Sequence, residues 1–440
     1  MGEIFSILTW YLVITLIGIS ALPLAYRFFH QLPAKGVTLA RPLGLLIWAF
    51  VFWLLNSLGI LQNDLGGQIV SFLILLVLST LAMRGGKFHE LLGWLKSSRR
   101  TIWVGEVVFV LLFIGWAWIR GMNPEAAYTE KPMELAFINS ILRSPSFPPQ
   151  DPWLSGYAIS YYYFGYVMIA MLTRITAVSA SVAFNLTSAL WFGMTAAALY
   201  GIVYDITSIW GKREGAAEGF SRRAGLLGPL FVLIISTVEG VLEFLHAGGV
   251  FWKDTGNSVL TSRFWTWLGI LDLNVPPTVP FDWIPSRPGG WLWWRGSRVI
   301  QDMTLSGANV EVIDEFPFFS YLLSDLHPHL LAVPFTLLAV AASLNLFAGA
   351  RLYISKETRI TGWAKNWTFW LTALILGSLG FINTWDFPIY VGLFCLVWAF
   401  MRYQSEGWMT GILWNFLKNG LVLGIAGFLL YLPFCRCVKK

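Results

Sequence analysis

Residues 5–26 read FSILTWYLVITLIGISALPLAY, an apolar run without a single charged side chain. An α-helix needs about 20 such residues to cross the hydrocarbon core of a bilayer. Similar runs recur along the whole chain, so the sequence predicts about ten membrane-spanning helices. They are expected near residues 5–26, 42–61, 67–83, 102–119, 181–206, 225–245, 328–348, 367–382, 387–401 and 412–432.

The composition of the chain agrees with a protein embedded in lipid. Of its 440 residues, 56% are hydrophobic and only 12% are charged, whereas a soluble domain carries about 25% charged residues. Backbone polar groups must be satisfied inside a bilayer, so the spans are expected to be helices, and the alternating segments of a transmembrane β-barrel do not occur. The predicted fold class is an all-α integral membrane protein with added interfacial helices. The net charge of +6 reflects basic residues in short loops, and no nucleic-acid partner is expected.

Lysine and arginine cluster in three short segments, residues 84–101, 207–224 and 349–365. Positive residues favour the cytoplasmic side, so these segments are predicted to be cytoplasmic in a multi-pass protein of the cell membrane. The long loops 120–180 and 246–327 then both face the extracytoplasmic side. Residues 161–178 are apolar enough to span, but a span there would move the basic segment 207–224 outside. The charge pattern therefore favours a helix at the interface, or one that only dips into the membrane.

The first outer loop carries two carboxylates, Glu130 and Glu134, at the start of a short predicted helix that ends near Arg143. Thr129 is placed to cap this helix. The two acids can compensate the helix dipole, or one of them can act as a general base at the membrane surface. Further on, the run Tyr161-Tyr162-Tyr163 is by its pattern more typical of an interfacial aromatic belt than of a binding site.

The second outer loop shows no periodicity that predicts its internal structure. Two arginines flanked by aromatic residues, Arg295 and Arg298, stand out in it. The guanidinium group matches phosphate with two parallel hydrogen bonds, so the pair either binds a phosphate of the substrate or anchors the loop to lipid headgroups. Glu239 and Glu243, one helical turn apart before this loop, are candidate buried charges without a predicted partner.

The end of this loop holds Asp325, His327 and His329 directly before a span. Ionisable residues at a membrane boundary are costly and usually functional. Together they can bind a divalent cation, position a phosphate or relay a proton. Capping of the next helix by Asp325 is the structural alternative, but it does not account for two histidines. Asp386, in a short turn on the same predicted side, either caps its own helix or lines the same cavity.

In this order the motifs resemble the YYY-motif family of prokaryotic integral membrane proteins, over about residues 100–390. The resemblance rests on Glu130-Lys131-Pro132-Met133, Pro148-Pro149-Gln150-Asp151-Pro152-Trp153, Tyr161-Tyr162-Tyr163-Phe164-Gly165, Ser297-Arg298-Val299-Ile300, and Glu315-Phe316-Pro317-Phe318-Phe319 through Asp325-Leu326-His327-Pro328-His329.

More distantly, the plan resembles GT-C glycosyltransferases, which transfer a sugar from a polyprenyl-phosphate donor on the outer face of the membrane. This resemblance implies a GT-C-like architecture with Glu130 at the position of the catalytic acid. It also implies that Asp325, His327 and His329 lie near the donor phosphate or a divalent cation, Mg²⁺ or Mn²⁺. The sequence departs from the pattern in having Glu134 four residues after Glu130 instead of an Asp-Glu pair, and in three extra preceding spans.

The sequence therefore predicts a membrane glycosyltransferase that acts on a polyprenyl-phosphate-linked sugar. Glu130 and Glu134 are the predicted catalytic residues, and Asp325, His327 and His329 the predicted metal ligands. The predicted substrate-binding residues are Lys131, Tyr161, Tyr162, Tyr163, Arg295, Arg298 and Asp386. A transporter or flippase of a lipid-linked substrate is the first alternative, although no internal repeat is evident. A non-catalytic membrane assembly protein is the second, and it would not require the acids and histidines to converge.

The predicted organisation has three parts. Residues 1–101 form an N-terminal three-helix membrane segment, residues 102–433 the GT-C-like core, and residues 434–440 an irregular end. The chain stops soon after a span, with basic residues on the predicted outer side, whereas the resemblance to the YYY-motif family implies further spans, so a truncated or shifted reading frame is expected at this end. The three cysteines, Cys395, Cys435 and Cys437, predict neither a disulfide framework nor a metal site with histidine.

Overall fold

The computed structural model describes residues 2–215, 218–256, 260–278, 280, 292–349 and 365–434. The chain divides into two compact units. Unit 1 comprises Met1–Pro229 and Asp325–Lys440, and unit 2 comprises Leu230–Ser324. Unit 2 covers most of the second predicted outer loop, and the boundary predicted at 101/102 falls inside unit 1. The predicted irregular end lies, apart from Phe434, outside the described residues.

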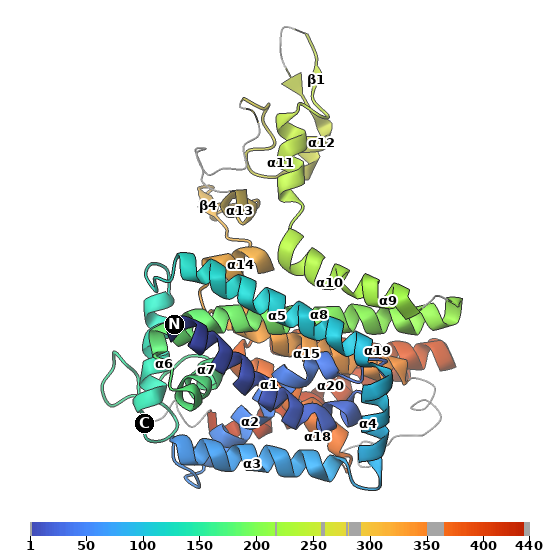
Figure 1. Cartoon of the computed structure of the whole chain (residues 1–440). Helices are drawn as coiled ribbons and strands as arrows, with labels where there is room; N and C mark the ends of the chain where they lie inside the picture. Colours follow the sequence, from blue (N-terminus) through green and yellow to red (C-terminus); the bar gives the residue numbers. More distant parts are fainter. Residues whose placement is uncertain are drawn as a thin grey trace. The chain divides into compact units, whose positions relative to one another are not determined.

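In the part of unit 1 that the structure describes, every named element is a helix (Figure 1). In chain order its elements are α1 (Gly2–Phe28), the 3-10 turn η1 (Val37–Leu39), α2 (Ala40–Ser57), α3 (Leu65–Ala82), α4 (Lys87–Ser97), α5 (Arg99–Met122), α6 (Lys131–Arg143), α7 (Phe164–Thr176), α8 (Ala180–Glu214), α9 (Glu218–Gly225), α10 (Leu227–Pro229), α15 (Pro328–Ala348), α18 (Trp367–Ile382), α19 (Asp386–Glu406) and α20 (Thr410–Leu430).

Within the described residues, eight helices are long and apolar enough to cross a membrane, and each corresponds to a predicted span. The prediction at 225–245 falls on a bent pair, Gly219–Ile235 and Glu239–Ala247, which makes a ninth span only if the pair is counted as one. The prediction at 367–382 is α18, whose 16 residues extend about 24 Å, less than the roughly 30 Å hydrocarbon core. The predicted number of ten is thus confirmed only in part.

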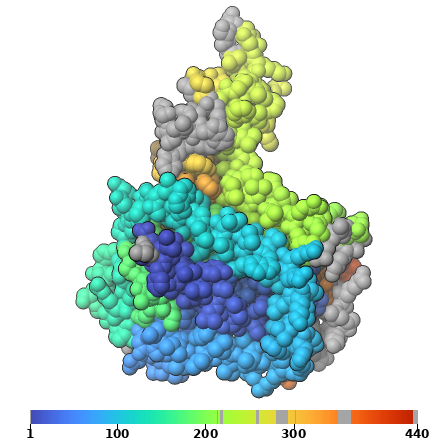
Figure 2. All heavy atoms as spheres, viewed as in Figure 1, coloured from blue at the N-terminus to red at the C-terminus, as the bar shows by residue number. Residues whose placement is uncertain are grey.

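The lipid-facing character of unit 1 is visible on its surface. Figure 2 shows α1, α3 and α5 side by side on one face of the molecule. Large apolar side chains on these helices are exposed, among them Leu8, Leu12, Leu73, Val77, Trp103, Leu111 and Trp118. Exposed apolar surface of this extent is unusual for a soluble protein and expected for a membrane protein. The chain is therefore a multi-pass membrane protein, and the candidate spans of unit 1 are all α-helices.

The tyrosine-rich segment forms α7, which at 13 residues is only about 20 Å long and too short to cross a bilayer. The prediction that residues 161–178 do not form a full span agrees with this length. The helix is not amphipathic in its packing, however, because every residue from Phe164 to Thr173 is buried. Instead of lying on a surface, α7 packs against α6 and α8 inside unit 1.

Unit 2 consists of short elements: the π-helical turn η2 (Leu230–Ile235), α11 (Glu239–Ala247), β1 (Lys253–Asp254), β2 (Leu260–Thr261), α12 (Arg263–Leu268), α13 (Leu292–Gly296), β3 (Gln301–Met303), β4 (Asn309–Glu311) and α14 (Pro317–Leu323). Each strand pair is an antiparallel hairpin, with Lys253 opposite Thr261 in the first and Gln301 opposite Glu311 in the second. Elements of two to nine residues are too short to show a hydrophobic period, which explains why the sequence predicted none of those after α11, whereas η2 and most of α11 fall within the predicted span 225–245.

Candidate functional site

The first half of the site is the turn that enters α6. Tyr128 and Thr129 both adopt left-handed backbone conformations, with φ of 64° and 49°, which is uncommon for residues other than glycine. This turn directs the Thr129 hydroxyl away from α6, where it donates a 2.6 Å hydrogen bond to Oδ1 of Asp325. The prediction that Thr129 caps α6 is therefore wrong. Glu130 occupies the cap position without a side-chain capping bond, and the helix ends at Arg143 as predicted.

The second half of the site is the segment Asp325–His327, which directly precedes α15. His327 has an extended ψ of 153° because the residue before a proline avoids the helical conformation. Leu326 is held on both sides: its N–H donates to Oε2 of Glu134 at 2.7 Å, and its carbonyl accepts a 2.9 Å bond from the Tyr166 hydroxyl. Helices α6 and α7 thus fix the backbone that carries Asp325 and His327.

These two halves bring four ionisable side chains together, here called the His327 cluster: Glu130, Glu134, Asp325 and His327. Nε2 of His327 lies 3.3 Å from Oε2 of Glu130, 3.7 Å from Oδ2 of Asp325 and 3.8 Å from Oε1 of Glu134. The side chains of Glu130 and His327 are 51% and 24% exposed, whereas those of Asp325 and Glu134 are 6% and 0% exposed. A reactant from outside can therefore meet the Glu130 carboxylate and part of the His327 ring, whose Nε2 atom is itself buried.

The two buried carboxylates differ in their surroundings. Burial, with a smaller contribution from the charges of Asp325 and Glu130, raises the pKa of Glu134 to about 9, so this side chain is protonated at neutral pH. Asp325 instead has stabilising partners, because it accepts from Thr129 and its Oδ1 lies 3.9 Å from Nζ of Lys131. The result is a neutral acid and a compensated carboxylate beneath the exposed pair.

The tyrosines of the run 161–163 have different environments. The Tyr161 ring lies 5.5 Å from that of Phe137 on α6. Burial, together with the charges of Glu130 and Glu134, raises the pKa of Tyr161 to about 12, which places it beside the His327 cluster. Tyr162 contacts Tyr161 at 5.3 Å between ring centroids. Tyr163 is buried in unit 1, where its hydroxyl accepts a hydrogen bond from Trp53.

His329 does not join the His327 cluster in the way that was predicted. Its residue is exposed, its ring centroid lies 5.5 Å from that of His327, and its electrostatic interaction is with Asp386. Asp386 accepts a 3.0 Å hydrogen bond from Asn383 at the start of α19. Across the described ranges, no three His, Cys, Asp or Glu side chains are arranged to hold a metal ion. Binding of Mg²⁺ or Mn²⁺ by Asp325, His327 and His329 therefore stays a prediction.

Comparison with protein families identifies one family to which the chain is similar. The family described as Uncharacterized membrane protein (DUF2298) matches residues 47–440. The chain belongs to the DUF2298 family. No curated protein and no solved structure matches it. The match extends through both halves of the His327 cluster and through unit 2, while the resemblances to the YYY-motif family and to GT-C enzymes stay predictions.

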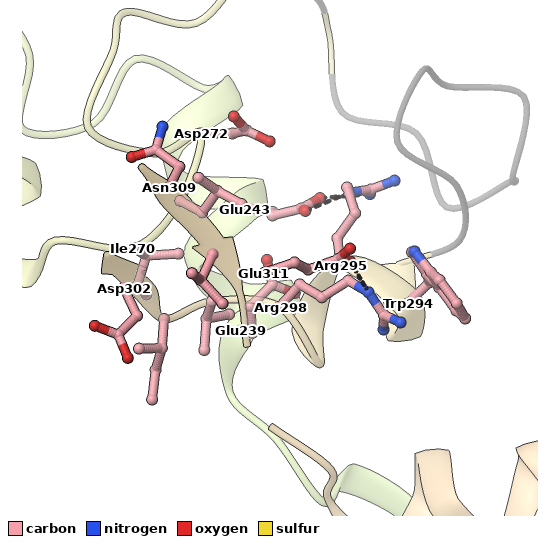
Figure 3. Close-up of a pocket in the computed structure, with 14 residues that line it drawn as sticks. Glu239, Glu243, Ile270, Asp272, Trp294, Arg295, Arg298, Asp302, Asn309 and Glu311 are labelled. Atoms are coloured by element: carbon pink, nitrogen blue, oxygen red, sulfur yellow. Dashed lines mark hydrogen bonds and ion pairs between the residues drawn. The ribbon is translucent and has the colours of Figure 1, made fainter. Parts of the chain in front are cut away.

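The two arginines of the DUF2298 chain that were predicted to bind substrate lie in unit 2, in a cavity of about 370 Å³ (Figure 3). Arg295 makes a bidentate ion pair with Glu243, at 2.6 and 2.7 Å. Arg298 pairs with Glu311 at 2.5 Å and stacks on Trp294. Glu243, for which the sequence predicted no partner, thus has one. Both guanidinium groups already face carboxylates, which argues against a site built for phosphate.

Three residues that support the His327 cluster in the DUF2298 chain were not predicted from the sequence to do so. Thr129 was assigned to a helix cap rather than to Asp325. Tyr166 was assigned only to an apolar helix, although its hydroxyl fixes the Leu326 carbonyl. Arg120, buried near the end of α5, hydrogen-bonds Asn185 and acts electrostatically on Asp325. For Arg120, the sequence signal was an arginine at the end of an apolar span.

Proposed function

We propose that this DUF2298 protein is a GT-C-like membrane glycosyltransferase that moves a sugar from a polyprenyl-phosphate donor to a hydroxyl acceptor. One observation carries the proposal: the exposed carboxylate of Glu130 lies 3.3 Å from Nε2 of His327, although the two residues are almost 200 positions apart in sequence. A purely structural role would not require an exposed carboxylate and an imidazole to converge over two buried acids. A buried acid with a raised pKa, such as Glu134 beside this pair, is typical of sites of acid–base catalysis.

In the proposed reaction Glu130 acts as the general base. It accepts the proton of the acceptor hydroxyl while the acceptor oxygen attacks the anomeric carbon of the donor sugar. The bond between this carbon and the phosphate oxygen breaks, and polyprenyl phosphate leaves with the electron pair. The proton then passes from Glu130 to water, so that no further reactant is consumed. His327 lies within reach to orient the Glu130 carboxylate and to shuttle this proton.

The buried groups set the charge around this pair. Glu134, neutral at pH 7, adds no negative charge beneath Glu130, and Lys131 offsets the charge of Asp325. A developing negative charge on the leaving phosphate is therefore not repelled by three ionised carboxylates. Tyr161 and Tyr162 offer hydroxyl donors beside the cluster for a sugar or a phosphate. No step of the proposed reaction is assigned to a divalent cation, because the described side chains supply no three-ligand arrangement.

The test is sugar transfer by the purified chain in proteoliposomes. Polyprenyl-phosphate mannose, glucose and galactose, each radiolabelled in the sugar, serve as donors, and water or membrane extract serves as acceptor. Loss of the general base should lower the rate of transfer by 10²–10⁴-fold in Glu130→Gln. The matched control is Glu125→Gln, an exposed carboxylate in the same loop, which should keep the wild-type rate. Thermal unfolding measured on both variants separates a loss of chemistry from a loss of fold.

Two results would refute the proposal. Full transfer by Glu130→Gln would show that Glu130 is not the general base. Absence of transfer from all three donors by the wild-type chain would show that polyprenyl-phosphate sugars are not its donors. If His327→Asn retains transfer while Glu130→Gln loses it, His327 does not shuttle the proton and has only a supporting role. Each outcome is read from the same assay at matched protein concentration.

One observation favours a transporter of a lipid-linked substrate as the second candidate. The segment around residues 219–247 is a bent helix pair with a π-helical turn at Leu230–Ile235, and interrupted helices are common in transporters. A fluorescent polyprenyl phosphate in proteoliposomes tests this candidate. Protein-dependent loss of its protection from an external quencher, unaffected by Glu130→Gln, would favour transport over catalysis.

A further inference from the structure

A basic hollow of about 310 Å³ lies in unit 1, where α4 ends, α5 begins and α9 runs past. Its lining contains no acidic residue and consists of Lys96, Ser97, Ser98, Arg99, Arg100, Thr101 and Arg222. The residues come from two of the segments predicted to be cytoplasmic, 84–101 and 207–224. The hollow is at the N-terminal end of α5, whereas the His327 cluster follows the C-terminal end of this 24-residue helix, about 36 Å away along its axis.

Three of the four cations of this hollow, all of them exposed, make no ion pair in the described part of the chain. Lys96, Arg99 and Arg100 form no salt bridge with any of the residues that the structure describes. Arg99 and Arg100 also occupy the first turn of α5, where the positive end of the helix dipole disfavours them. The positive-inside tendency accounts for basic residues in this segment, but not for their convergence with Arg222 around one concave space.

Polar groups without a partner around the hollow point to a bound anion. Thr101 is only 2% exposed and lines the hollow, yet no group in the described part of the chain hydrogen-bonds its hydroxyl. Ser98, at the cap position of α5, makes no side-chain capping bond. The first N–H groups of α5 are therefore also available. An anion in the hollow would accept hydrogen bonds from this hydroxyl and from these N–H groups.

We infer that this hollow binds a phosphate monoester, in the manner of helix N-termini that hold phosphate with added arginine contacts. The first turn of α5 also begins a candidate membrane span, so the hollow lies at the level of the lipid headgroups. An anionic phospholipid is therefore the first source of the phosphate, and a soluble phosphate compound is the second. Helix-dipole compensation at the C-terminus of α4 explains Lys96 alone. The inference does not rest on the proposed transferase activity.

The experiment uses the full chain purified in detergent and in nanodiscs. Dioleoyl phosphatidic acid is titrated against dioleoyl phosphatidylcholine by native mass spectrometry, and inorganic phosphate is titrated by calorimetry. We expect phosphatidic acid to bind in preference to phosphatidylcholine. Arg99→Gln with Arg100→Gln should weaken this binding at least tenfold, because two charge-assisted contacts are lost. Thr101→Val, which keeps the side-chain shape, should weaken it several-fold without changing thermal stability by more than a few degrees.

The matched control removes equal charge from the same two segments. Arg84→Gln with Arg223→Gln alters exposed arginines that do not line the hollow, and it should leave the affinity within twofold. Equal weakening in this control would overturn the inference, since binding would then follow surface charge alone. Unchanged affinity in Thr101→Val and in the double arginine variant would also overturn it. Inorganic phosphate that binds as tightly as phosphatidic acid, and is lost in the same variants, would support the site and assign it to a soluble phosphate.

Discussion

Replacing Glu134 with glutamine should make the folded chain less sensitive to alkaline pH. Burial raises the pKa of Glu134 from 4.5 to about 9, so the folded state favours the protonated side chain. The stabilising contribution of this raised pKa is fully present below the unfolded value and is lost as the pH rises towards 9. Between these two values the unfolded chain has released the proton and the folded chain still holds it.

The size of the effect follows from this difference in proton binding. One proton between the two states changes the free energy of unfolding by about 1.4 kcal/mol for each pH unit. From pH 6 to pH 8, Glu134 should therefore cost the wild-type chain about 3 kcal/mol of stability. Glu134→Gln removes this cost because the amide stays uncharged, and its oxygen can still accept the 2.7 Å bond from the Leu326 N–H.

The assay is equilibrium unfolding in detergent, followed by tryptophan fluorescence at pH 6, 7 and 8. The quantity of interest is the difference in unfolding free energy between variant and wild type, because other titrating groups cancel in it. This difference should grow by about 3 kcal/mol in favour of Glu134→Gln, and remain constant for Glu125→Gln. A difference that does not change with pH would refute the neutral state of Glu134. Retained sugar transfer by Glu134→Gln at pH 7 would further separate its role from that of Glu130.

Three other substitutions test how the site and the bundle are held. Thr129→Ala should lower the unfolding free energy by about 1.5–3 kcal/mol, because it removes the hydrogen bond to the buried carboxyl group of Asp325, and Thr129→Ser should restore it. Tyr166→Phe should cost about 1 kcal/mol and also slow transfer, seen as a lower kcat in the proteoliposome assay. Gly377→Ala should cost about 1–3 kcal/mol, because its Cβ would lie 2.6 Å from a carbonyl oxygen of α20. Gly392→Ala, where a Cβ meets nothing within 4 Å, should have no such effect in thermal unfolding.

Most of unit 1 could be predicted because a membrane span has a strong local signal. Twenty apolar residues in sequence identify a helix without knowledge of its neighbours. The signal fails where a helix is short, as in α18, or where an apolar run is interrupted, as at residues 219–247. It also fails in unit 2, whose short helices and hairpins are held by contacts between residues far apart in sequence, such as Arg295 with Glu243.

The sequence allowed us to predict which residues form the candidate site, but not the hydrogen bonds and ion pairs that hold them. Glu130, Asp325 and His327 could be singled out because ionisable residues are rare in such a chain. Their hydrogen-bond partners could not be predicted, because each partner is brought close only by the tertiary fold. Thr129 has the sequence position of a helix cap, and only the left-handed turn at Tyr128 and Thr129 directs its hydroxyl to Asp325. The same limit applies to Arg298, whose partner Glu311 lies across a hairpin.

The division of labour between Glu130 and Glu134 shows how the fold assigns different chemistry to the same side chain. Residues four apart on a helix lie on one face, so both carboxylates point towards His327, but only the first reaches the surface. The second is fully buried under the segment Asp325–His327, where its acceptor oxygen is used by Leu326 and its charge is disfavoured. One acid is therefore exposed, as the proposed proton transfer requires, while the other is a neutral support. Moving the backbone of Leu326 away from α6 would let water reach Glu134, lower its pKa and place a second negative charge beneath Glu130. In the proposed reaction, that single backbone contact should therefore decide whether an anionic phosphate donor can approach Glu130.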